Sequence, residues 1–283
     1  MPNHFPTLAF ILAHILLQCQ SPQSAAKDLL PYRFNVPGLT FELDKDLREI
    51  SGLAWWNTDT LVAIEDESAT IYFLSAKDGS ILKKTNFGDK GDYEGIAMFE
   101  RIIYVLRSDG DVFKVDHPLR EKSKADKNET DLSQSDDAEG LCYAPQTKSL
   151  LIAVKEEGDN KGKRSIHQLE LEAKDIEKKP FLLIDEDLLL HELHTKYGNR
   201  FGSSFKPSGI AVHPQNGDLY VASAAHHLLA AFDQEKKLKD VIRLPKAYAH
   251  QVEGICFAPD GRLFISTEGV DGRGKIVVLK MVK

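Results

Sequence analysis

The chain has 283 residues and a formal net charge of −7, with 36 Lys and Arg against 43 Asp and Glu. Nucleic-acid-binding domains need a basic face, so the mildly acidic balance argues against a nucleic-acid partner. No interior apolar run is long enough to cross a bilayer.

The N-terminal segment has the features of an export leader. Residues 8–17 are apolar apart from His14 and have the length of a signal-peptide core. The run Leu16-Leu17-Gln18-Cys19 is similar to a bacterial lipoprotein box, in which the cysteine receives the lipid. Ordinary cleavage after Ala26 is the alternative. We therefore expect residues 1–26 to be a leader and linker, and the protein to be extracytoplasmic, either membrane-associated through a lipidated Cys19 or periplasmic.

Residues 31–283 contain one short motif five times. Three copies carry Glu-Gly and two carry Ser-Gly; they occupy residues 92–97, 137–142, 251–256, 49–54 and 206–211. The motif glycines, at 52, 95, 140, 209 and 254, are separated by 43, 45, 69 and 45 residues. A period in the forties, in a chain rich in short strands, indicates an all-β fold, the β-propeller, with one motif per blade.

Each motif begins the first strand of a blade, and a short β-branched or aromatic run follows as the second strand. Second strands are predicted at 61–64, 102–106, 150–154, 219–222 and 263–266. Third strands are predicted at 70–74, 111–115, 165–171, 228–232 and 275–279. Fourth strands are clear at 81–87, 181–185 and 238–244, and the second blade has a weak one within 128–135.

The last repeat ends after its third strand, so another segment must complete it. Residues 39–43 alternate in polarity and belong to no other blade, and we expect them to supply the missing strand and to close the ring. This predicts five four-stranded blades, with six blades, one of them eroded, as the alternative. The longest interval between motifs leaves room for one short amphipathic helix within 185–205.

Strand direction places the residues before each first strand and after each second strand on one face of the ring. We expect this face to bind a ligand, while the turns on the other face look like plain connectors. The candidate ligand-binding residues are Glu65, Asp66, Arg107, Lys155, Glu156, His226, His227 and His250.

The motif glutamates Glu94, Glu139 and Glu253 should converge at the mouth of the central channel. Two carboxylates about 5–6 Å apart repel by roughly 3 kcal/mol at an effective dielectric of 20, so a bound cation, a raised pKa or a neighbouring Arg107 or Lys155 must offset them. Oxygen ligands favour Ca²⁺, and a histidine contribution would allow Zn²⁺ or Mn²⁺. The structural alternative is that each Glu, like Ser51 and Ser208 in the other two copies, accepts backbone hydrogen bonds and only ties blades together.

Two further residue types have structural explanations. Cys142 and Cys256 occupy the same position of two non-adjacent repeats, so we expect buried core residues rather than a disulfide. The motif glycines are expected where strands approach too closely for a side chain.

The repeated Glu/Ser-Gly-Ile/Leu motif, with the opening segment 43–53 and the closing segment 253–261, resembles the SdiA-regulated family. The resemblance covers about residues 35–283 and implies a bacterial propeller that is extracytoplasmic or membrane-attached. Gluconolactonase-like and esterase-like phytase propellers also place a Glu before a Gly at the channel mouth and bind a divalent ion there. By that similarity the metal ligands here would be Glu94, Glu139 and Glu253.

Three functions are open at this stage. The leading hypothesis is an exported propeller, anchored to the membrane, that binds a small molecule or protein at its carboxylate-lined rim through Ca²⁺. The second is a metal-dependent hydrolase of an ester, lactone or phosphoester, with His226 or His250 as base and Arg107 or Lys155 stabilising an anion. The third is a protein-interaction scaffold that uses the rim and the helix at 186–197.

Overall fold

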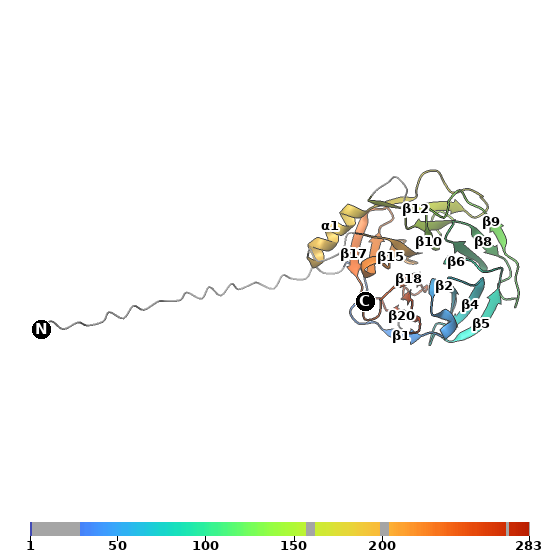
Figure 1. Cartoon of the computed structure of the whole chain (residues 1–283), viewed down its shortest axis with the longest axis horizontal. Coiled ribbons are helices and arrows are strands. Elements are labelled where there is room, and N and C mark those ends of the chain that lie inside the picture. Colours follow the sequence, from blue (N-terminus) through green and yellow to red (C-terminus); the bar gives the residue numbers. More distant parts are fainter. Residues whose placement is uncertain (2–28, 157–161, 199–203, 270–271, 283) are drawn as a thin grey trace.

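The computed structural model describes residues 1, 29–156, 162–198, 204–269 and 272–282. The predicted leader, including Cys19, lies outside these ranges except for its first residue. The described chain forms five four-stranded antiparallel sheets arranged around a central axis (Figure 1). The predicted five-bladed propeller is therefore confirmed.

The strands of the first four blades follow one another in sequence order from the axis outward. The first contains β2 (Ile50–Asn57), β3 (Thr60–Glu65), β4 (Thr70–Ser75) and β5 (Ile81–Asn86). The second contains β6 (Tyr93–Phe99), β7 (Ile102–Arg107), β8 (Val112–Val115) and β9 (Asp126–Asn128). The third contains β10 (Ala138–Ala144), β11 (Ser149–Val154), β12 (Lys163–Glu170) and β13 (Leu182–Asp185). The fourth contains β14 (Pro207–Val212), β15 (Leu219–Ser223), β16 (Leu228–Phe232) and β17 (Leu238–Arg243).

The fifth blade is built from both ends of the described chain. Strands β18 (Val252–Phe257), β19 (Leu263–Thr267) and β20 (Lys275–Leu279) are completed by β1 (Leu39–Glu42), in the order β1-β20-β19-β18. Leu39 pairs with Val278, and Glu42 pairs with Lys275. The N-terminal strand thus occupies the predicted place and covers the outer edge of β20. A second contact between the two chain ends lies upstream of β1, where the Tyr32 hydroxyl donates to the Gly261 carbonyl at 2.7 Å.

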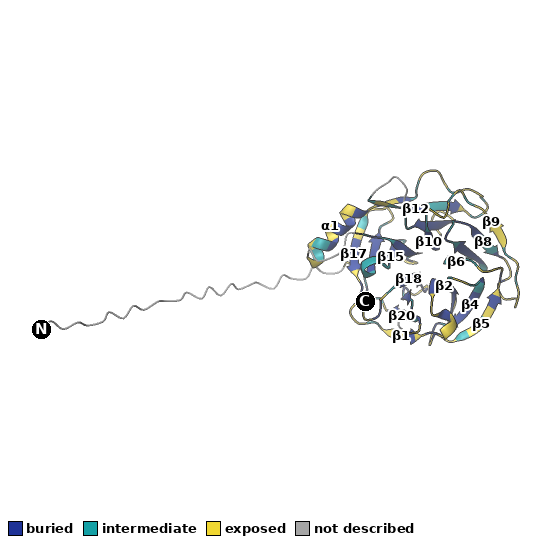
Figure 2. Cartoon of the chain, in the orientation of Figure 1, coloured by how far each residue is buried: buried dark blue, intermediate teal, exposed yellow. Residues whose placement is uncertain are grey.

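Burial falls from the axis outward because the inner strands are covered by neighbouring blades on both faces. All six residues of β11 are buried, whereas buried and exposed residues alternate along β13 (Figure 2). The glycines lie where the inner strands meet. A Cβ on Gly95 would come within 2.7 Å of the Leu141 Cβ, and one on Gly209 within 2.1 Å of the Glu253 carbonyl oxygen. The predicted steric reason for the glycines is confirmed.

Two elements depart from the regular repeat, namely the short strand β9 and one helix. The fourth strand of the second blade is β9 at Asp126–Asn128, upstream of most of the predicted range 128–135, which is a correction. The charged sequence of β9 has no apolar pattern, and its three residues are held by pairing with β8 and by polar contacts such as that of the Asn128 amide with the Ala173 carbonyl. Helix α1 (Glu186–Tyr197) is the predicted insertion and lies against β17 at the outer edge of the ring (Figure 1). The cysteines 142 and 256 are buried free thiols, as expected.

Closure by β1 should contribute measurably to stability. Phe41 is the buried residue of β1 and packs in the core between the fifth and first blades, whereas Thr40 is exposed. We expect Phe41→Ala to lower the free energy of unfolding by about 3 kcal/mol, because it leaves a cavity at the seam. Thr40→Ala should cost less than about 1 kcal/mol. Urea unfolding measures both changes. Equal losses of unfolding free energy in the two variants would contradict a stabilising contribution from Phe41.

Candidate functional site

The connections that enter the first strands and leave the second strands lie on one face of the ring, and the central channel opens there. At the level of the motif residues the channel has a volume of about 10 Å³, which is room for a single water molecule. Ser51, Glu94, Glu139 and Ser208 line it together with the motif glycines. A site at this level can therefore admit an ion or a water, and larger ligands can bind only above it.

The two motif serines tie blades together. Ser51 Oγ donates to the Tyr93 carbonyl of the second blade at 2.7 Å, and Ser208 Oγ donates to the Val252 carbonyl of the fifth blade at 2.6 Å. The predicted inter-blade tie is confirmed for these two positions. Its predicted direction was wrong, because the hydroxyl donates to a carbonyl instead of accepting from an N–H. An ionised carboxylate has no proton to donate, so it cannot replace the serine in this bond.

Two of the three motif glutamates, Glu94 and Glu139, line the channel, and Glu253 lies close enough for its charge to act on Glu94. Glu139 and Glu253 are 5% and 7% exposed, and Glu94 is partly buried. Burial, followed by the charges of Glu139, Asp92 and Glu253, raises the pKa of Glu94 to about 10. Burial also raises the pKa of Glu253 well above its ordinary value, with the Glu139 charge as the next cause. The charges of Glu139 and Glu253 thus both favour the neutral form of Glu94.

One cation balances part of this charge. Lys155 Nζ is hydrogen-bonded to the Glu139 carboxylate and lies 3.4 Å from that of Asp137. Burial raises the pKa of Glu139 to about 7, although Lys155 opposes the shift. Burial disfavours the charged amine of Lys155, but the Glu139 carboxylate more than offsets this and raises the pKa of Lys155. If all three glutamates ionise, Lys155 balances only part of their charge, because it also faces Asp137.

A second group of acids extends the negative surface between the first and fifth blades. Burial raises the pKa of Asp66 to about 6, with Glu49 and Glu65 as further causes. Burial, followed by the charges of Asp66 and Glu49, also raises the pKa of Glu268. Our sequence-based candidates include Asp66 but omit Glu49. The signal was present, because Glu49 stands three residues before a motif glycine, as Asp92 and Asp137 do in their copies.

Two other predicted rim carboxylates are engaged locally. The Glu65 carboxylate accepts the backbone N–H groups of Glu67 and Ser68, at 3.1 and 2.8 Å, and so holds its own loop. Glu156 forms an ion pair with Lys206, which links the third blade to the fourth. These contacts give both side chains a structural role on the rim.

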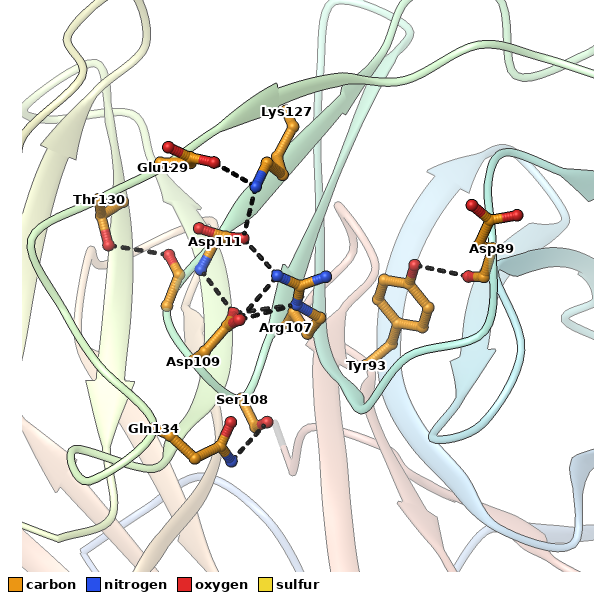
Figure 3. A network of polar contacts seen from close by, with 11 residues as sticks. Asp89, Tyr93, Arg107, Ser108, Asp109, Asp111, Lys127, Glu129, Thr130 and Gln134 are labelled. Atoms are coloured by element: carbon orange, nitrogen blue, oxygen red, sulfur yellow. Dashed lines mark hydrogen bonds and ion pairs between the residues drawn. The ribbon is translucent and has the colours of Figure 1, made fainter.

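Arg107 belongs to a network within the second blade rather than to the mouth. Its guanidinium contacts Asp109 in a forked arrangement and also contacts Asp111, which Lys127 approaches at 3.3 Å (Figure 3). The same guanidinium lies 5.3 Å from the centre of the Phe113 ring. The predicted cation is on the expected face, but its partners are aspartates of its own loop.

The histidines form a separate group where the fourth blade meets the fifth. His226 and His227 lie in a 3-10 turn, Ala225–His227, and both have left-handed backbone angles, with φ of 62° and 58°. The ring centres of His227 and His250 are 6.0 Å apart. Burial, followed by the charge of His250, lowers the pKa of His227.

A preformed metal site is not visible in this arrangement. Among the described residues, no group of three His, Cys, Asp or Glu side chains is close enough to hold one ion. The described part of the chain also contains no helix with the length and apolar character to span a membrane.

Several solved structures share this fold. Glutaminyl cyclase from Myxococcus xanthus has 15% sequence identity and a TM-score of 0.59, covering 88% of this chain and 97% of its own. A luciferin-regenerating enzyme has 12% identity and a TM-score of 0.53, over 87% and 95% of the two chains. Aldose sugar dehydrogenase from Streptomyces coelicolor, in its PQQ-bound form, has 16% identity and a TM-score of 0.53, over 87% and 99%.

At these identities the likeness shows the fold alone. A search of curated proteins finds no match. The SdiA-regulated family pattern matches residues 28–269, which is most of the sequence. The chain therefore belongs to the SdiA-regulated family, as its repeated motif indicated.

Proposed function

We propose that this propeller is a binding protein whose channel mouth captures a cation on Glu94, Glu139 and Glu253, with Ca²⁺ as the best candidate. The observation that carries the proposal is the crowding of three motif glutamates beside a single lysine, Lys155. Lys155 is shared between Glu139 and Asp137, so the three ionised motif carboxylates would leave an excess of negative charge that a divalent cation can reduce. The water-sized channel at this level suits an ion better than an organic ligand.

Ca²⁺ fits the available donors better than the other common ions do. Carboxylate oxygens dominate the mouth, and Ca²⁺ accepts oxygen ligands in flexible geometry, whereas Mg²⁺ demands a near-ideal octahedron. The three side chains are not gathered into a ligand set, so binding requires them to turn toward one another. Because Glu94 and Glu139 have raised pKa values, an arriving cation would displace protons.

Binding has better support than hydrolysis. The two cations assigned to anion stabilisation in the hydrolase hypothesis are engaged by carboxylates, Lys155 by Glu139 and Arg107 by Asp109 and Asp111. The ring centres of His227 and His250 lie 6.0 Å apart, and within the described ranges neither ring forms a hydrogen bond or ion pair with a motif glutamate. A ligand bound above the ion would meet the acids and histidines of the rim.

Calorimetric titration of the full-length chain with Ca²⁺ near neutral pH tests the cation proposal. We expect a saturable heat that changes with the ionisation enthalpy of the buffer, because binding releases protons. Glu139→Gln should weaken Ca²⁺ binding by about tenfold or more, since it removes one charged ligand from the site. The matched control is Glu121→Gln, an exposed glutamate whose backbone bonds to the outer strand β5.

Glu121→Gln should therefore bind Ca²⁺ as the unaltered chain does, whereas Glu139→Gln should bind it more weakly. Equal heats for Glu139→Gln and the unaltered chain would contradict a site at the mouth, as would a complete absence of Ca²⁺ binding. Substrate turnover that a chelator abolishes would instead support the hydrolase hypothesis.

We also propose that the protein is exported and held to a membrane through a lipid on Cys19. The apolar run at 8–17 and the lipoprotein-like box support this location. The first described residue after the leader, Leu29, donates its backbone N–H to Asp240 of the fourth blade at 2.7 Å. The tether would therefore join the ring at the outer edge of that blade.

Metabolic labelling with palmitate in a bacterial host tests the anchor. The unaltered chain should take up label and Cys19→Ser should not, because the thiol is the acceptor. Cys142→Ser, which changes a buried free cysteine, should keep the label. Label retained by Cys19→Ser, or none on the unaltered chain, would overturn the anchor.

A further inference from the structure

A second candidate site lies on the face opposite the channel mouth, between the third and fourth blades. The turns that join first to second strands and third to fourth strands meet there and enclose a cavity of about 240 Å³. This face was predicted to carry plain connectors, and no motif pointed to it. The cavity is separate from the motif glutamates, and no residue of the channel lining takes part in it.

The inside of the cavity is apolar. Side chains from strands of both blades form its walls, namely Leu151, Leu182, Val212, Leu219 and Phe232. Four of these five residues are buried, Val212 is half-buried, and all belong to or pack on the core between the blades. A void with such walls favours an apolar guest, because dispersion contacts are missing while it is empty.

The mouth of the cavity is polar and carries a cation. Lys236 Nζ lies 3.8 Å from the centre of the Phe181 ring, and both residues line the cavity. The amides of Gln146 and Gln234 line the same opening. The Asp233 carboxylate also lines it, but its Oδ1 accepts the backbone N–H groups of Glu235 and Lys237 and so holds the turn.

Lys236 differs from the two other lysines of this turn. Lys237 pairs with Glu235 at 2.6 Å, and Lys239 pairs with Asp218 at 2.7 Å. Within the described ranges, no ion pair involves Lys236. Its backbone has a φ of 65°, a left-handed conformation within the turn, and its side chain lies over the Phe181 ring. An available cation at the rim of an apolar cavity is suited to a ligand with an apolar body and one negative end.

We infer that this cavity binds a medium-chain carboxylate, with its tail among the apolar walls and its carboxylate on Lys236. The size sets the length of the ligand. A 150 Å³ apolar cavity accepts benzene, which has six heavy atoms, so 240 Å³ corresponds to about ten heavy atoms, the size of octanoate. The Gln146 amide can donate to the second carboxylate oxygen, as can the second N–H of the Gln234 amide, whose nitrogen already donates to the Asn216 carbonyl at 2.7 Å.

Calorimetric or ligand-observed NMR titration of the full-length chain with sodium octanoate tests the inference. Octanoate should bind saturably, and octanol, which has the same tail without the charge, should bind about tenfold or more weakly, because the charge-assisted contact is lost. Lys236→Gln should reduce octanoate affinity by about tenfold and leave octanol unchanged. The matched control is Lys237→Gln, whose amine is already paired, and octanoate affinity should be unaffected.

A second variant tests the cavity itself. Val212→Phe replaces a half-buried wall residue by a bulkier aromatic one. It should fill the cavity and abolish the binding of both octanoate and octanol. Lys236 is exposed, so its variant remains informative if Val212→Phe fails to fold. The inference is overturned if the unaltered chain binds no octanoate, if octanol binds as tightly as octanoate, or if Lys236→Gln leaves octanoate affinity unchanged.

Discussion

The close approach of five first strands around the axis constrains everything else in this molecule. Backbones meet there so tightly that Gly209 has a neighbouring carbonyl oxygen within 2.1 Å of where a Cβ would stand. The residue before each glycine must therefore lie at the channel mouth next to the following blade. Ser51 and Ser208 meet this constraint with a hydroxyl that donates to a carbonyl of that blade.

Glutamate at the same position creates a different local chemistry. A protonated Glu94 can donate a hydrogen bond as the serines do, whereas an ionised one adds charge to a mouth that already holds Glu139 and Glu253. The raised pKa values express this conflict, because burial and the neighbouring acids both favour the neutral form. A bound cation would have the opposite effect, because it would stabilise the ionised carboxylates. The proposed binding function rests on this choice between protons and a cation.

The architecture was predictable from the sequence because the repeat, the glycines and the missing last strand are all local patterns. The 39–43 segment paired with β20 as expected, since nothing else could complete the fifth blade. Strand β9 was misplaced because its charged residues have no pattern of their own and depend on pairing with β8. The pairing of Arg107 with Asp109 and Asp111 was also missed. The sequence places Arg107 on the predicted face, but it does not show that the side chain turns toward the aspartates of its own loop. The cavity near Lys236 depends on how two blades splay apart, which no single segment encodes.

The most direct test of the central claim is the pH dependence of the free energy of unfolding in the presence of a chelator. An acid with a raised folded-state pKa stabilises the fold below its unfolded value, near 4.5, and this stability is lost as the pH rises toward the folded value. Stability should therefore fall as the pH rises, from about 4.5 through about 7 for Glu139 and on toward about 10 for Glu94. Glu94→Gln, which keeps the neutral form, should flatten the profile and gain at least about 1.4 kcal/mol over the unaltered chain in mild alkali, the value of one pKa unit. Identical profiles for the two proteins, or stability that rises across this range, would contradict the claim that the mouth holds protons in the absence of a cation.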